Sequence, residues 1–162
     1  MSVTNEFLEA NERYAAQFTK GDLPLPPARK IAVVACMDAR MDPARMLGLE
    51  EGDAHVIRNA GGRAVDAMRS LIISQQLLGT REIVVIHHTD CGMLTFTDPQ
   101  LHEKLQTELG TDTELTFHSF ADLERSVRED VATIKASPVL LAGVPVRGFV
   151  YEVETGRLRE VA

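Results

Sequence analysis

Apolar and polar positions alternate along the chain between strand patterns and helical patterns. The unbroken apolar segment 31–36 (IAVVAC) and the segment 82–87 (EIVVIH), with its apolar centre IVVI, are typical of strands buried on both faces. Segments at 54–58 and 147–153 predict two further strands. Residues 158–161 follow a Thr155-Gly156 turn and predict an edge strand.

Helical spacing separates these strands. It predicts helices over 63–78, 98–109 and 119–136, and a short helix that is capped by Asp42, begins at Pro43 and ends at Gly48. A further amphipathic helix is predicted over about 4–18, with an apolar stripe that must pack on its own core or on a partner subunit. That stripe consists of Phe7, Leu8, Tyr14, Ala15 and Phe18.

The order of these elements predicts the fold class. Strands that alternate with helices favour an α/β fold, with a mainly parallel sheet of about four strands plus an edge strand, flanked by helices. We expect a single domain over 1–162, in which the proline-rich segment LPLPPARK joins an N-terminal helical arm (1–22) to an α/β core (23–162). Ligands of such sheets bind outside the carboxyl ends of the strands.

Composition and charge narrow the function classes. The 17 basic and 24 acidic residues give a net charge of −7, which argues against a nucleic-acid-binding protein. No apolar segment is long enough to span a bilayer, and the N-terminus lacks the pattern of a signal peptide. Two cysteines are too few for a secreted disulfide scaffold. These features favour a cytoplasmic enzyme or binding domain without membrane attachment.

The candidate chemistry lies at two strand ends. The first strand ends in CMDAR (36–40) and the third in HHTDCG (87–92), so both cysteines lie where the carboxyl ends of parallel strands meet. Cys36 and Cys91 with His88 form the Cys2His set of a catalytic zinc site. His88 is favoured over His87 because neighbouring strand residues point to opposite faces, and we expect His87 to be half-buried. Spacing alone leaves open a pair of buried apolar cysteines or a redox couple.

The two motifs together, with HVIRNAGG at 55–62, resemble the β-class carbonic anhydrases of the compact bacterial type. The resemblance covers about residues 30–153. It implies a Zn²⁺-dependent lyase that reversibly hydrates carbon dioxide to bicarbonate and a proton. It also implies a homodimer or a dimer-based tetramer, which the amphipathic arm would fit.

The resemblance assigns roles to individual residues. Cys36, His88 and Cys91 would bind zinc, and a zinc-bound hydroxide would attack carbon dioxide. Asp38 and Arg40 match the catalytic Asp–Arg pair of the family. With Asp38 on Arg40 the fourth zinc position is open, and with Asp38 on the metal, as a fourth ligand, the site is closed. An ordinary surface ion pair is the alternative interpretation of this pair.

Other interpretations stay open at this point. Asn59-Ala60-Gly61-Gly62 is either a wall of the bicarbonate pocket or a tight turn between a strand and a helix. Arg58 stays outside the predicted catalytic set. His87 and Asp90 are weak candidates for moving the proton. The chain has no tryptophan, so an allosteric bicarbonate site that contains one is incomplete. The same scaffold would also suit a carbon disulfide or carbonyl sulfide hydrolase, or a non-catalytic zinc or redox sensor.

Overall fold

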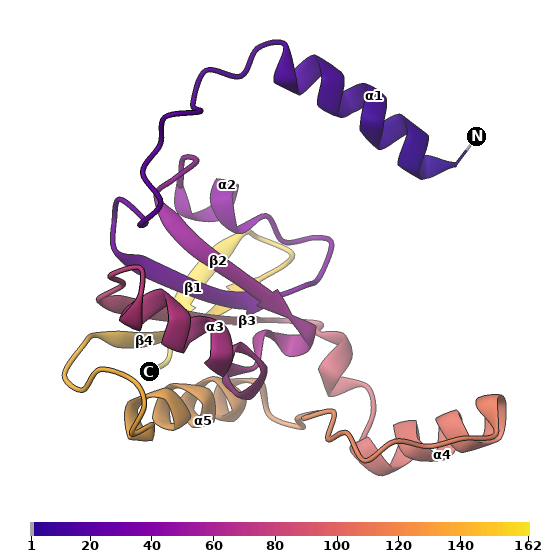
Figure 1. The fold of residues 1–162 in the computed structure, drawn as a ribbon. Coiled ribbons are helices and arrows are strands. Elements are labelled where there is room, and N and C mark those ends of the chain that lie inside the picture. Colours follow the sequence, from indigo (N-terminus) through magenta and orange to yellow (C-terminus); the bar gives the residue numbers. More distant parts are fainter. Residues whose placement is uncertain (1) are drawn as a thin grey trace.

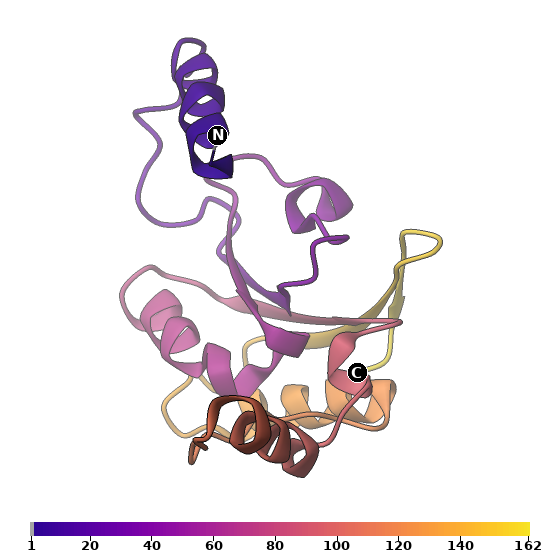
Figure 2. The same ribbon diagram turned by 90° about the vertical axis from the view of Figure 1, so that its right-hand side faces the viewer.

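A computed structural model describes residues 2–162 and contains a central five-stranded sheet (Figures 1 and 2). The strand order is β2-β1-β3-β4-β5; the first four strands pair in parallel and β5 is antiparallel to β4. The strands are β1 (Ile31–Cys36), β2 (Ala54–Asn59), β3 (Glu82–His88), β4 (Val146–Glu152) and β5 (Arg157–Glu160). This architecture confirms the predicted fold class.

Helices α3 (Ala64–Gln76) and α5 (Leu123–Ala136) cover one face of the sheet (Figure 1). Their apolar side chains pack on alternate residues of the central strands, such as Val34 and Val85, in a continuous core. The opposite face packs against α2 (Pro43–Leu47) and the short 3-10 helix η2 (Gly92–Leu94), through residues that include Val33 and Ile86. Successive residues of β1 and β3 therefore serve two different cores.

Two helices extend away from the sheet. Helix α1 (Val3–Ala15) stands apart from the core in both views, and α4 (Asp98–Leu109) projects at the other end of the molecule (Figures 1 and 2). Neither helix contains a buried residue. The apolar stripe predicted for the N-terminal helix therefore has no partner within the described chain.

The local signals place most boundaries correctly. Asp42 caps α2 by accepting from the backbone N–H of Arg45, Pro43 occupies the first turn, and Gly48 ends the helix in a left-handed conformation. Several boundaries elsewhere differ from expectation, most of them by a single residue, and three are examples. Helix α1 ends at Ala15 rather than 18, β3 continues to His88, and α5 begins at Leu123 because Asp122 caps it.

Within residues 2–162, none of the helices combines the length and the apolar character that a membrane span requires.

Candidate metal centre

The parallel pairing of β1 with β3 brings the two predicted motifs together. Ala35 lies opposite Ile86 in the register, so Cys36 and His88 emerge at the same edge of the sheet. The sheet neighbours of β1 are β2 on one side and β3 on the other, so the strand order reverses its direction at β1. The carboxyl ends of strands at such a point are the usual position of a ligand site. Ligand atoms of Cys36, His88 and Cys91 all lie within 4.8 Å of one another, and all three residues are buried.

The imidazole of His88 is oriented for a metal ion. Its Nδ1 lies 2.8 Å from the carbonyl oxygen of Thr89, which only accepts hydrogen bonds, so Nδ1 carries the hydrogen. Nε2 is buried and has no hydrogen-bond partner. A buried nitrogen lone pair without a partner is costly, and its position beside two sulfur atoms fits a zinc ion.

The two thiols influence each other. A hydrogen bond with Cys91 lowers the pKa of Cys36, assisted by His88 and by the backbone N–H groups of Asp38 and Gly61, although burial opposes this shift. The same contact with Cys36, together with burial, raises the pKa of Cys91 above its usual range. Without a metal ion, Cys36 therefore loses its proton first and Cys91 retains its own. A cation between the two sulfurs would allow both to be thiolates.

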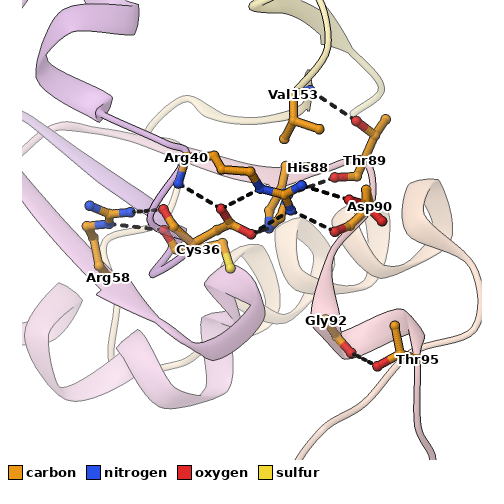
Figure 3. A network of polar contacts seen from close by, with 10 residues as sticks. Cys36, Arg40, Arg58, His88, Thr89, Asp90, Gly92, Thr95 and Val153 are labelled. Atoms are coloured by element: carbon orange, nitrogen blue, oxygen red, sulfur yellow. Dashed lines mark hydrogen bonds and ion pairs between the residues drawn. The ribbon is translucent and has the colours of Figure 1, made fainter.

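Asp38 is held by Arg40, which lies near Cys36 and His88 (Figure 3). Arg40 donates from Nε to Oδ1 at 2.9 Å and from Nη2 to Oδ2 at 2.8 Å, and its backbone N–H donates to Oδ1. The hydrogen bonds from Arg40 hold the pKa of Asp38 well below its usual range, although partial burial opposes this. The Oδ2 atom lies 3.7 Å from His88 Nε2, so Asp38 borders the ligand cluster.

Arg40 also contacts the segment that carries the other two candidate ligands, His88 and Cys91. Its Nη1 donates to the Asp90 carboxylate at 2.7 Å and its Nη2 donates to the Asp90 carbonyl oxygen at 2.9 Å. Asp90 immediately precedes Cys91 and is largely exposed. One guanidinium thus joins the loops after β1 and β3.

Arg58 supports the first motif in a way that the sequence did not predict. Its Nε donates to the carbonyl oxygen of Cys36 at 3.0 Å and its Nη2 donates to that of Asp38 at 2.7 Å (Figure 3). Arg58 lies on β2, which pairs with β1. Only the pairing of β2 with β1 could have indicated this role, because every residue has a backbone carbonyl oxygen and the sequence does not show which of them accepts.

The Asn59–Gly62 segment forms the 3-10 turn η1 (Ala60–Gly62), which lies against the ends of β1 and β3. Gly62 has a φ of 66°, and a Cβ atom there would lie 2.9 Å from the backbone nitrogen of Cys36 and 3.0 Å from the carbonyl oxygen of Ile86. The left-handed conformation and the close approach both require glycine at this position.

The structure corrects one expectation about His87. It is fully buried rather than half-buried, and it faces α5, whereas His88 faces the cysteines. Its ring contacts Ser126 and Asp130, which lie 39 and 43 positions away in the chain. The opposite orientations of the two histidines follow the predicted alternation.

A cavity of about 490 Å³ opens beside the sulfur atoms. Its apolar lining comes from the loop after β1, from η2 and the residues that follow it, from α4 and from the segment before α5: Met37, Met93, Phe96, Leu101 and Phe117. A small uncharged molecule would find little competition from polar groups in this cavity.

Comparison with known proteins fits this geometry. A model of the carbonic anhydrase family matches residues 31–158. Beta-carbonic anhydrase 1 of Mycobacterium tuberculosis is 51% identical over 162 residues, which is 99% of both chains. The chain belongs to the β-class carbonic anhydrase family. As a member of that family it is an enzyme of the carbonic anhydrase class.

Further relatives span two named activities. The crystal structure of a carbonic anhydrase from Streptococcus mutans superposes with a TM-score of 0.95 at 48% identity and covers 100% of this chain and 99% of its own. A carbon disulfide hydrolase of Saccharolobus solfataricus is 34% identical, over 96% of this chain and 87% of that protein. The family thus includes enzymes named for different linear substrates.

Proposed function

We propose that this enzyme catalyses the reversible hydration of carbon dioxide to bicarbonate, with zinc held by Cys36, His88 and Cys91. The proposal depends mainly on the buried, unpartnered Nε2 of His88, which lies with two sulfur atoms in one cluster. When bound, zinc would supply a hydroxide nucleophile near neutral pH by acidifying water.

Asp38 and Arg40 would control access to the remaining position beside the ligands. Both carboxylate oxygens of Asp38 accept hydrogen bonds from Arg40, which keeps the carboxylate ionised and directed toward the guanidinium. In this arrangement Asp38 can accept a hydrogen from the reacting water and orient it toward carbon dioxide. Rotation of Asp38 toward the sulfurs would place it as a fourth ligand and close the site.

The apolar cavity would hold carbon dioxide. Its lining by Met93, Leu101 and Phe117 suits an uncharged linear molecule and disfavours the bicarbonate product, which promotes product release. Asp90 is exposed at the outer side of Arg40 and is a candidate for passing the proton to solvent. His87 is fully buried and faces α5, which argues against that role.

Zinc content together with stopped-flow carbon dioxide hydration tests this proposal. We expect about one zinc per chain and hydration that rises between about pH 6.5 and 9, as a reacting water loses its proton. One zinc per chain without hydration at any pH would reject the reaction but keep the metal site. Absence of zinc, with both cysteines reduced, would reject the metal site itself.

Carbon disulfide or carbonyl sulfide hydrolysis is the second candidate activity. The apolar lining of the cavity suits it as well, because these molecules, like carbon dioxide, are linear and uncharged. Relatives that are 34% identical are named carbon disulfide hydrolases. An assay of the three substrates with one preparation ranks the two candidates by kcat/KM.

We also propose that the enzyme is a cytoplasmic homodimer. Phe7 and Leu8 on α1 are 65% and 62% exposed, and a 13-residue helix is only marginally stable without tertiary contacts. A second copy of the chain would cover this stripe, and two such dimers could form a tetramer. Both cysteines are free thiols, which is consistent with a reducing compartment.

A further inference from the structure

A buried polar network lies beneath the η1 turn. Asp130 on α5 is 1% exposed, and its carboxylate accepts two hydrogen bonds and forms one ion pair. Oδ2 accepts from the backbone N–H of Ala64 at 3.0 Å and from His87 Nε2 at 3.1 Å. Oδ1 lies 3.1 Å from Nη2 of Arg63. These donors come from β3 and from the residues that follow the turn.

His87 connects this carboxylate to the turn itself. Its Nε2 also lies 3.2 Å from the carbonyl oxygen of Gly62. Both neighbours of Nε2 are acceptors, so Nε2 carries the hydrogen and donates to them. Nδ1 lies 2.7 Å from the Ser126 hydroxyl, and the ring stacks on Phe120 at a centroid distance of 5.4 Å. The imidazole therefore has a fixed orientation.

Asn59 closes the turn from its other side. Its side-chain oxygen accepts from the backbone N–H of Arg63 at 2.7 Å, and its amide donates to the Arg63 carbonyl oxygen at 2.9 Å. Asn59 thus connects the two ends of the turn by hydrogen bonds, and His87 and Asp130 bind it from the side of α5. Little freedom remains for Gly61 and Gly62 to move.

The position of this turn affects the metal ligands directly. The turn lies against the residue that carries the first sulfur: a Cβ atom on Gly62 would lie 2.9 Å from the backbone nitrogen of Cys36, and Gly61 lines the same apolar cavity as Cys36. A contact of the Gly61 N–H with the Cys36 sulfur is one of the causes that lower the pKa of this thiol. Hydrogen bonds to a ligand sulfur withdraw charge from it and thereby tune the bound metal. A small shift of the turn would move this donor away from the sulfur.

Stability alone explains the network poorly. Buried ion pairs are often no more stabilising than apolar side chains of similar volume. Arg63 Nε in addition is buried without a partner, an arrangement that costs free energy. The network is therefore better explained by the need to hold the η1 turn in one position than by a gain in the free energy of folding.

We propose that His87 and Asp130 are positioning residues, which fix the η1 turn so that the Gly61 N–H donates to the Cys36 sulfur. The inference rests on the proposed zinc site, since it concerns the surroundings of a ligand. Neither residue is placed to touch substrate. They act through the backbone of the turn.

Cobalt substitution tests this inference with a readout other than activity. Co²⁺ in the wild-type site gives a thiolate-to-cobalt charge-transfer band, whose energy depends on hydrogen bonds to the sulfurs. We expect Asp130→Asn and His87→Leu to shift this band to longer wavelength with about one cobalt still bound per chain. In the zinc enzymes we expect kcat/KM to fall about tenfold.

Two variants keep the result interpretable. His87→Gln retains an N–H donor toward Gly62 and should restore most of the wild-type band. Thr80→Val removes a comparable buried hydrogen bond, between the hydroxyls of Thr80 and Ser74, at the far end of α3. It should lower the melting temperature without moving the band.

The outcomes separate the two proposals. The positioning role would be overturned if Asp130→Asn and His87→Leu keep the wild-type band and kcat/KM. In that case they would lose only thermal stability, as Thr80→Val does. If Asp130→Asn does not fold, His87→Leu and His87→Gln decide the question by themselves. A wild-type enzyme that binds cobalt without a thiolate band would overturn the metal site, and the positioning role with it.

Discussion

Arg40 binds Asp38 through two parallel hydrogen bonds and binds Asp90 with its remaining donors. The pair is therefore more than a surface contact within the loop after β1. It connects the loop that follows Cys36 to the residue that precedes Cys91. Loss of this guanidinium would free a carboxylate 3.7 Å from His88.

Arg40→Ala should lower carbon dioxide hydration at neutral pH by at least about tenfold, with zinc retained, because Asp38 would then be free to bind the metal. The double variant Asp38→Ala/Arg40→Ala should be no less active than Asp38→Ala alone, since Arg40 acts through that carboxylate. Arg125→Ala removes an exposed ion pair with Glu129 and serves as the control. Additive losses in the double variant would contradict the coupling. Stopped-flow hydration and zinc analysis provide the measurements.

Zinc affinity should fall steeply on acidification. Contact with Cys36 and burial raise the pKa of Cys91, so this thiol holds its proton at neutral pH. Burial lowers the pKa of His88, but the Cys36 sulfur and the Thr89 carbonyl outweigh this effect and raise it. Above the pKa of His88 zinc displaces only the Cys91 proton, and below it a second proton from Nε2. The affinity should therefore fall by about tenfold per pH unit at first and by about 100-fold per pH unit on further acidification.

Competition with a chromophoric chelator between about pH 5 and 8 measures this dependence. His88→Ala removes one of the displaced protons and should reduce the slope to about tenfold per unit. An affinity that does not depend on pH would contradict the assigned protonation of the metal-free site.

Gly62→Ala should destabilise the enzyme more than Gly48→Ala. Both glycines have left-handed φ values, of 66° and 62°, but only at Gly62 would a Cβ atom meet backbone atoms at about 3 Å. The shared conformational penalty is about 1–2 kcal/mol, and the close contact should add about 1–3 kcal/mol at Gly62. Urea unfolding of both variants measures the difference. An equal loss of unfolding free energy in the two variants would show that the turn can move away from β1.

Asp98→Asn should reduce stability at neutral pH. Burial alone would raise the pKa of Asp98, but the Ser119 hydroxyl and the backbone N–H groups of residues 117–119 outweigh it and lower the pKa to about 2. The ionised carboxylate therefore stabilises the fold above the unfolded pKa of about 4, and this contribution disappears as the pH falls toward 2.

We expect Asp98→Asn to lower the free energy of unfolding by about 1–2 kcal/mol at pH 7. The difference in stability between the variant and the wild type should narrow at acidic pH. Thermal unfolding at pH 7 and near pH 3 measures it. Asp22→Asn, at an exposed position between α1 and β1, is the control. A gap that widens on acidification would contradict the assigned pKa shift.

Phe7→Glu should weaken the proposed dimer, because it places a charge within the exposed apolar stripe of α1. Sedimentation equilibrium should show a shift toward the monomer mass, whereas Glu12→Gln on the same helix should leave the mass unchanged. A wild-type enzyme that already sediments as a monomer would refute the dimer.

Local chemistry made much of the fold predictable. The apolar run of β1 and the Asp42, Pro43 and Gly48 signals around α2 depend on adjacent residues, and the structure confirms them. The cluster of Cys36, His88 and Cys91 was predictable because each residue lies at or just after the end of a recognisable strand. Their zinc ion and catalytic roles remain proposals.

What the sequence did not reveal depends on distant partners. The burial of His87 depends on Ser126 and Asp130, which reach it only after α5 packs on the sheet. Arg58 recognises backbone carbonyl oxygens, which every residue possesses. A linear pattern cannot indicate either relationship.

The pairing of β1 with β3 also determines when the ligand cluster can form. Cys36 and Cys91 are 55 positions apart, and the segment between β1 and β3 contains β2 and two helices. Closing so long a loop is entropically costly and slow compared with local turns. In the unfolded chain only His88 and Cys91 are near enough to share a metal ion. The complete centre is therefore a late product of folding, and a metal ion bound there would fasten the first and third strands after the sheet has assembled.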